Sequence, residues 1–210
     1  CWNYGKLQPT KRIGRNSTQN ANAPKSAADM MNQTVFDTSE VLVRKGLKHV
    51  VLSPGSRNAP LTISFARNPG IKTYNVVDER SAGFIALGIA QNLKEPVVLC
   101  CTSGTSLLNY APAIAEAFYQ GIPLIVMSAD RPPEWIGQRD GQTIDQSGAL
   151  SNFVKATIQL PSSPLHPDEQ WEYIRKLNDG VNLSISGKSG PVHMNIPFKE
   201  PFYPSAAASF

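Results

Sequence analysis

The sequence predicts an α/β fold, a three-layer, doubly wound parallel sheet with helices on both faces. Short and unbroken apolar runs, such as 49–53, 96–101 and 123–128, alternate with longer segments whose apolar residues have helical spacing. Strands that are apolar on both sides are typical of a parallel sheet covered by helices on its two faces.

In chain order, apolar periodicity and turn residues predict a regular alternation of elements. Strands are expected at 49–53, 71–77, 96–101, 123–128, 153–160 and 191–196, and helices at 34–47, 61–66, 81–92, 107–119 and 168–184. Because Phe84–Ala90 carries no charge, strand 71–77 and the helix after it are expected to be buried. Trp171, on the apolar face of the last helix, is expected in the core.

The length of 210 residues, 41% of them apolar, fits one domain of ordinary size. We expect a disordered basic tail at 1–33, one folded domain at 34–204 and a short tail at 205–210. The first 25 residues hold five of the 20 basic residues and no acid, so the remainder has 15 basic against 16 acidic residues. A nearly neutral body argues against nucleic-acid binding. No apolar run approaches the roughly 20 residues of a membrane span, so no membrane partner is expected.

Two adjacent cysteines, Cys100 and Cys101, lie inside an expected strand. Neighbouring side chains of a strand point to opposite faces, so these two form neither a disulfide nor a metal pair. Unpaired cysteines favour a reducing compartment, and we expect a cytoplasmic location.

Four polar loops follow directly after expected strands, at 54–57, 78–80, 103–105 and 130–133. The carboxyl ends of parallel strands meet at one edge of the sheet, where open α/β folds bind their ligands. The sequence therefore predicts a binding site at this edge.

Each loop also has a simpler interpretation. Asp78 or Ser81 could cap the helix that follows, and residues 103–106 could be an ordinary helix start or could hold an anion or the edge of a heterocycle. Arg57 and Arg131 lie beside turn-forming prolines on this edge. A pair of arginines suits a carboxylate, because each guanidinium can donate two parallel hydrogen bonds.

Five motifs occur together and in a fixed order: Ser53–Thr62, Asp78–Ala82, Cys101–Thr105, Ala129–Glu134 and Gln142–Gln146. Together they resemble the N-terminal, pyrimidine-binding domain of the MenD family. Its members are the thiamine diphosphate-dependent 2-succinyl-5-enolpyruvyl-6-hydroxy-3-cyclohexene-1-carboxylate (SEPHCHC) synthases of menaquinone biosynthesis. The resemblance extends over 34–204, and residues 190–198 are similar to the segment that ends this domain.

The resemblance implies that Glu79 is the catalytic, cofactor-activating glutamate, which hydrogen-bonds the aminopyrimidine ring and favours its imino tautomer. A buried carboxylate suits that role, because a low dielectric constant strengthens the hydrogen bond. Besides Glu79, the implied cofactor-binding residues are Pro54, Gly55, Ser103, Gly104, Thr105 and Asn109. The implied contacts to isochorismate are Ser56, Arg57, Arg131 and Gln142.

The resemblance further implies a reaction in which 2-oxoglutarate is decarboxylated and its four-carbon remainder is added to isochorismate. The diphosphate and its Mg²⁺ or Mn²⁺ would be bound by another domain, whose Gly-Asp-Gly segment is absent here. No metal-ligand set is expected in this chain. The family forms its active site between two subunits, which implies a homodimer or homotetramer and an isolated chain without turnover. Gly141 departs from the asparagine that the family often has at this position.

Two alternatives remain open. The first is the same domain from another thiamine diphosphate-dependent decarboxylase or ligase, although such enzymes commonly show His-Glu where this chain has Asp78-Glu79. The second is a non-catalytic anion-binding or assembly module that keeps the fold. In that case, Glu79→Gln would be harmless in the complete protein.

Overall fold

The computed structural model describes residues 27–162, 164 and 166–200. It contains a six-stranded, entirely parallel sheet in the order β2-β1-β3-β4-β6-β5, which confirms the predicted fold class. The strands are β1 (His49–Leu52), β2 (Lys72–Asn75), β3 (Val97–Cys101), β4 (Leu124–Asp130), β5 (Thr157–Gln159) and β6 (Val192–Pro197).

Helices connect successive strands. They are α1 (Ala27–Arg44), α2 (Ala59–Arg67), α3 (Glu79–Leu93), α4 (Thr105–Asn109), α5 (Ala111–Gln120), α6 (Pro167–Ile185) and the single 3₁₀ turn η1 (Pro133–Trp135). The first helix begins at Ala27 rather than at the expected Thr34. Most of the expected N-terminal tail and all of the C-terminal tail lie outside the described residues. None of the described helices combines the length and apolar character needed to cross a membrane.

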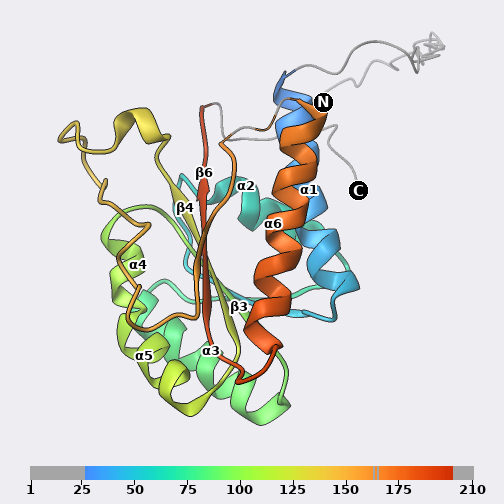
Figure 1. Ribbon diagram of the computed structural model, residues 1–210, viewed down its shortest axis with the longest axis vertical. Coiled ribbons are helices and arrows are strands. Elements are labelled where there is room, and N and C mark those ends of the chain that lie inside the picture. The colour runs from blue at the N-terminus through green and yellow to red at the C-terminus, as the bar shows by residue number, and fades with distance from the viewer. Residues whose placement is uncertain (1–26, 163, 165, 201–210) are drawn as a thin grey trace, which may run out of the picture.

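Two apolar cores lie on opposite faces of the sheet. Helices α1, α2 and α6 cover one face, and α3, α4 and α5 cover the other (Figure 1). Alternate residues of each strand belong to different cores, so that Cys100 packs in the first core and Cys101 in the second. Both thiols are free and buried, as predicted from their adjacent positions. Each fully buried aliphatic side chain contributes about 1.5–3 kcal/mol, and the central strands β3 and β4 are buried throughout.

Two predictions about helices were wrong in detail. The expected single helix 107–119 is divided at Tyr110 into α4 and α5. Pro112 lies in the first turn of α5, where its missing backbone N–H costs least. Trp171 is 66% exposed, because α6 turns Tyr173, Leu177 and Val181 toward the core.

The expectation of a buried strand and helix at 71–92 was also wrong. Strand β2 lies at the edge of the sheet, so its side chains are only partly covered. Helix α3 buries its inner side but leaves Phe84 48% and Ile85 41% exposed. Val77, just before the helix, is 81% exposed. This region therefore carries more large apolar side chains than the described part of the chain buries.

The chain reverses its direction of winding between β1 and β3. From β1 the sheet grows outward to β2 on one side and then through β3 and β4 on the other. Such a switch point leaves a crevice at the carboxyl ends of the two central strands, the usual ligand position in this architecture. The loop after β1 and the loop after β3 touch at this crevice, since a Cβ on Gly55 would lie 2.5 Å from the Cβ of Thr102.

Candidate functional site

Asp78 and Glu79 begin helix α3 and have different environments. Asp78 is the N-cap, and its Oδ1 accepts a hydrogen bond from the backbone N–H of Ser81 at 2.7 Å. This hydrogen bond lowers the pKa of Asp78 below its ordinary value. The capping role is thus filled by Asp78, and the Glu79 side chain instead contacts helix α4.

The Glu79 carboxylate is held by two residues of α4. Ser106 donates its hydroxyl to Oε1, and the Asn109 side-chain amide donates to Oε2 at 3.5 Å. Ser106 and Asn109 lie three positions apart, so they share one face of the helix. Our sequence-based set of cofactor residues included Asn109 but missed Ser106, which this spacing could have indicated.

Glu79 is half-buried rather than buried. The reason is the edge position of β2, which leaves the start of α3 at the surface. A carboxylate can accept about four hydrogen bonds, and Ser106 and Asn109 use two of these. The remaining capacity fits an N–H donor from a heterocycle at this exposed edge.

The loop after β3 packs against the segment around Gln142. The Ser103 hydroxyl donates to the Gln142 carbonyl at 3.2 Å, and the Gln142 amide donates to the Ser103 carbonyl at 3.2 Å. Gly104 has φ +80, and a Cβ there would lie 2.7 Å from the Gln142 carbonyl oxygen. Only glycine fits this contact. One expected cofactor segment and one expected substrate residue are therefore physically joined.

The expected cofactor residues differ in how accessible they are. Pro54, Thr105 and Asn109 are exposed and Gly55 is partly buried. Ser103 is 2% exposed and donates its hydroxyl within the protein. The backbone N–H of Gly104 donates to the side chain of Gln146 at 2.6 Å.

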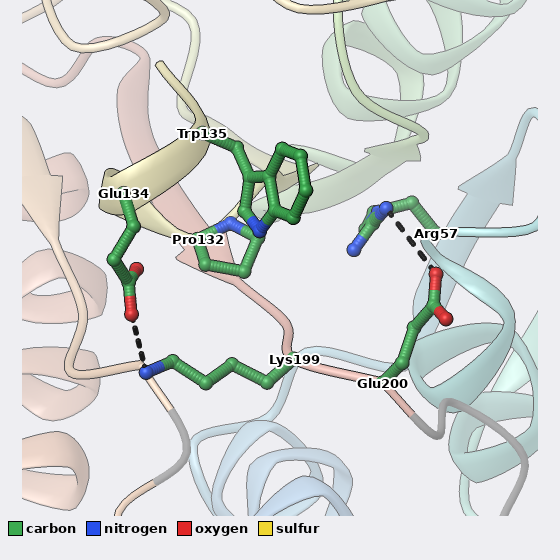
Figure 2. A pocket seen from close by; sticks show the side chains of 6 residues that line it. All are labelled: Arg57, Pro132, Glu134, Trp135, Lys199 and Glu200. Carbon is green, nitrogen blue, oxygen red and sulfur yellow. Dashed lines mark hydrogen bonds and ion pairs between the residues drawn. The ribbon is translucent and has the colours of Figure 1, made fainter. Parts of the chain in front are cut away.

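Arg57 lies in the wall of a cleft of about 390 Å³ (Figure 2). Its guanidinium donates to the Phe198 carbonyl at 2.9 Å and lies 4.0 Å from the carboxylate of Glu200. Burial lowers the pKa of Arg57, and the nearby charge of Arg131 lowers it further. The neighbouring Ser56 is exposed. The cleft is lined by Arg57, Pro132, Glu134, Trp135, Lys199 and Glu200.

Figure 2 shows two ion pairs on opposite sides of this cleft. Lys199 lies 2.6 Å from Glu134 on one side, and Arg57 faces Glu200 on the other. The Trp135 ring lies between them, above Pro132. An incoming anion would have to compete with these two carboxylates for the cations.

Arg131 directly follows β4. Its Nη2 donates to the Gly141 carbonyl at 3.1 Å and lies 3.3 Å from the carboxylate of Asp140. Its Nε is buried and has no hydrogen-bond partner among the described residues, which costs about 1–3 kcal/mol. The side chain as a whole is 24% exposed, so its charged end is accessible to an anionic ligand. Gly141 contributes through its backbone, which any residue at this position would supply.

A buried polar network lies beneath the loops that carry these residues. Gln146, Asn195 and Asp130 are 1%, 2% and 4% exposed. Burial raises the pKa of Asp130, and hydrogen bonds from Asn195 and from the Arg131 backbone partly oppose this shift. Ser128 joins the network to His193 through a hydrogen bond of 2.7 Å, and burial lowers the pKa of His193 to about 4. The imidazole is therefore neutral.

No cluster of three or more His, Cys, Asp or Glu side chains with metal-ligand geometry exists among the described residues. The polar groups at the sheet edge instead provide a carboxylate with two donors, two arginines and an exposed threonine. This combination fits an uncharged heterocycle and an anionic substrate.

Comparison with known proteins gives the class of protein to which this sheet edge belongs. Residues 34–149 match the family model described as the thiamine pyrophosphate enzyme, N-terminal TPP binding domain. The chain therefore belongs to the thiamine pyrophosphate enzyme family.

Within that family, the chain is similar to the N-terminal part of SEPHCHC synthases, as the resemblance of its motifs predicted. The 2-succinyl-5-enolpyruvyl-6-hydroxy-3-cyclohexene-1-carboxylate synthase of Cytophaga hutchinsonii is 54% identical over 178 residues, which are 85% of this chain and 32% of that enzyme. The same enzyme of Porphyromonas gingivalis is 54% identical over 159 residues, covering 76% and 28%. That of Desulfotalea psychrophila is 48% identical over 171 residues, covering 81% and 32%. The chain spans about a third of the length of these relatives.

Proposed function

We propose that this chain is the pyrimidine-binding domain of a cytoplasmic SEPHCHC synthase, which joins 2-oxoglutarate to isochorismate with loss of CO₂. The observation that carries the proposal is the Glu79 carboxylate, held by Ser106 and Asn109 at the edge of a thiamine pyrophosphate family domain. The free, buried thiols of Cys100 and Cys101 support the cytoplasmic location.

Glu79 is the proposed catalytic residue. When bound, thiamine diphosphate supplies the electron sink that decarboxylation requires. The carboxylate of Glu79, held by Ser106 and Asn109, would accept a hydrogen bond from the ring and so hold the proton of that N–H at a fixed position. Asn109, Thr105, Pro54 and Gly55 are proposed to contact the pyrimidine, whereas Ser103 and Gly104 hold the loop before α4 through their contacts with Gln142 and Gln146.

The acceptor substrate is proposed to bind at the two arginines. Isochorismate carries carboxylates, and the partly exposed guanidinium of Arg131 is a donor suited to one of them. Arg57 would have to exchange its contact with Glu200, which at 4.0 Å is long for an ion pair. Ser56 is exposed beside Arg57, and Gln142 holds the loop that carries Ser103.

The remaining parts of the site are proposed to come from elsewhere in the complete protein. A diphosphate-binding domain would supply Mg²⁺ or Mn²⁺ and would come from a second subunit of a homodimer or homotetramer. Exposed apolar side chains in α3, in α4 and just before α3 support this proposal, because exposed apolar surface of this kind marks interaction sites. They are Val77, Phe84, Ile85 and Leu108.

Glu79→Gln in the full-length enzyme tests the catalytic proposal. It keeps the size of the side chain but removes its negative charge, and we expect product formation to fall at least a hundredfold with little change in stability. The matched control is Glu172→Gln, which removes an exposed carboxylate paired with Lys176 on α6. Full activity of the Glu79 variant would contradict the proposal and would favour a non-catalytic module.

Isothermal titration of isochorismate into this chain and into its arginine variants tests the acceptor site. Arg57→Ala and Arg131→Ala should each weaken binding by about 1.5–3 kcal/mol, the range for hydrogen bonds to charged groups. Unchanged binding in both variants would show that the acceptor lies elsewhere.

A further inference from the structure

We propose that Gln146 is a positioning residue that joins the cofactor side of the site to the substrate side through the buried network. This inference rests on the proposed function, because it assigns the two sides to the two ligands. Gln146 itself is 1% exposed, so it acts only through the residues that it contacts.

The side-chain oxygen of Gln146 fixes the start of helix α4. It accepts the backbone N–H of Gly104 at 2.6 Å, at a residue whose left-handed conformation allows no side chain. Helix α4 begins at the next residue and carries Ser106 and Asn109, the two donors to Glu79. The position of the Glu79 partners therefore depends on this hydrogen bond.

The side-chain nitrogen of Gln146 points to the other side of the site. It lies 2.7 Å from Asn195 Oδ1, 3.2 Å from the Ala129 carbonyl and 3.1 Å from the Ser128 hydroxyl oxygen. These three acceptors share the two hydrogens of the amide nitrogen. Asn195 in turn donates to Asp130 at 2.6 Å, and the other oxygen of Asp130 accepts the backbone N–H of Arg131 at 2.7 Å. A continuous chain of hydrogen bonds thus runs from Gly104 to Arg131.

No simpler role accounts for this arrangement equally well. An amide buried only for stability need not lie at the ligand edge of the sheet, as Asn68 shows: at the end of α2 it accepts the Gly70 N–H at 2.9 Å and donates to Ser39 of α1. Gln146 instead connects the ends of three strands, β3, β4 and β6, at the edge where the ligands are proposed to bind. Losing a buried hydrogen-bonded group should therefore disturb both ligands at once.

Gln146→Met in the full-length enzyme tests this inference, with Asn68→Leu as the matched control. Both substitutions replace a buried amide of similar shape by an apolar side chain. We expect the half-saturating concentration of thiamine diphosphate and the KM for isochorismate each to rise about tenfold in the Gln146 variant, the effect of one lost buried hydrogen bond. The Asn68 variant should leave both constants unchanged, and equal behaviour of the two variants would overturn the inference.

Hydrogen–deuterium exchange provides a readout that does not depend on activity. In the wild-type enzyme the Gly104 amide should exchange slowly, and in Gln146→Met it should exchange at least tenfold faster. Exchange of the wild-type Gly104 amide as fast as an exposed loop would overturn the inference, even if Gln146→Met failed to fold. A wild-type enzyme that needs no thiamine diphosphate would instead contradict the proposed function, whereas an active enzyme with unshifted constants in the variant would contradict only this inference.

Discussion

Replacing Gly83 by alanine should force helices α3 and α5 apart. Gly83 lies in the middle of α3, where a Cβ would be 2.9 Å from the Cβ of Ala113 and 3.6 Å from the ring of Tyr110. The Ala113 methyl group has no rotamer by which to avoid this contact. The two helices would therefore have to separate by several tenths of an ångström.

The free-energy cost can be isolated with a second glycine of the same helix. Overpacking of this kind costs about 1–3 kcal/mol, while alanine in a helix interior is about 1 kcal/mol more favourable than glycine. A Cβ on Gly88 would meet no atom within 4 Å. Gly88→Ala should therefore gain about 1 kcal/mol, whereas Gly83→Ala should be neutral or lose up to about 2 kcal/mol.

Urea unfolding of the two variants measures this difference directly. The helix-propensity gain is common to both, so the difference between their free energies of unfolding, about 1–3 kcal/mol, reports the steric contact alone. Equal stabilisation by the two substitutions would refute the close approach of α3 and α5 at Gly83. That result would also argue against the helix packing that holds Glu79 opposite Ser106.

Three further predictions concern single side chains. Ser106→Ala should raise the half-saturating concentration of thiamine diphosphate in the full-length enzyme about tenfold, because Glu79 loses a charge-assisted hydrogen bond; an unchanged value would show that Ser106 does not support Glu79. Cys100 and Cys101 should react with a thiol reagent only after unfolding, because burial raises the pKa of Cys100 to about 12 and raises that of Cys101 as well. Modification of either in the native chain, mapped by mass spectrometry, would contradict their burial. The free energy of unfolding should fall by up to about 3 kcal/mol as the pH is lowered from about 6.5 to about 4, because the unfolded chain protonates His193 in this range while burial keeps it neutral in the fold. His193→Gln should remove this part of the pH dependence and leave the opposite contribution of Asp130, whose folded-state pKa is raised; the same pH slope in both proteins would contradict it.

The strands and the edge of the sheet that carries the site follow from local patterns. Runs such as Val97–Cys101 are apolar at every position, which only a strand covered on both faces requires. The loops after β1, β2, β3 and β4 then lie at one edge by geometry alone, without knowledge of any long-range contact. This is why Arg57 and Arg131 could be selected as candidates from the sequence, whereas the role of Glu79 in the loop after β2 came from the resemblance to a family.

The supports of the site could not be predicted in the same way. Ser106 contacts Glu79 across 27 positions, and Gln146 contacts Gly104 across 42. Both residues lie in segments that the sequence analysis singled out, but the contacts that they make depend on how separate loops pack. For Trp171 the sequence predicted burial where the structure shows exposure. Helical spacing defines an apolar stripe only to within about one residue, and α6 faces the core with Tyr173, Leu177 and Val181 instead.

The wrong expectation of a buried α3 supports the proposed assembly. Phe84–Ala90 has the composition of a helix covered on both sides, yet the described chain covers only one. Phe84 and Ile85 lie on the outer side of α3, and Leu108 precedes Asn109, a partner of Glu79. A second domain that packs on all three, as proposed, and so extends from α3 to α4 would also exclude water from Glu79. A lower local dielectric constant strengthens the hydrogen bonds that Glu79 accepts from Ser106 and Asn109. It also raises the cost of losing either partner. Covering this apolar surface would thus complete both the core of the assembly and the environment of the carboxylate that we propose to be catalytic.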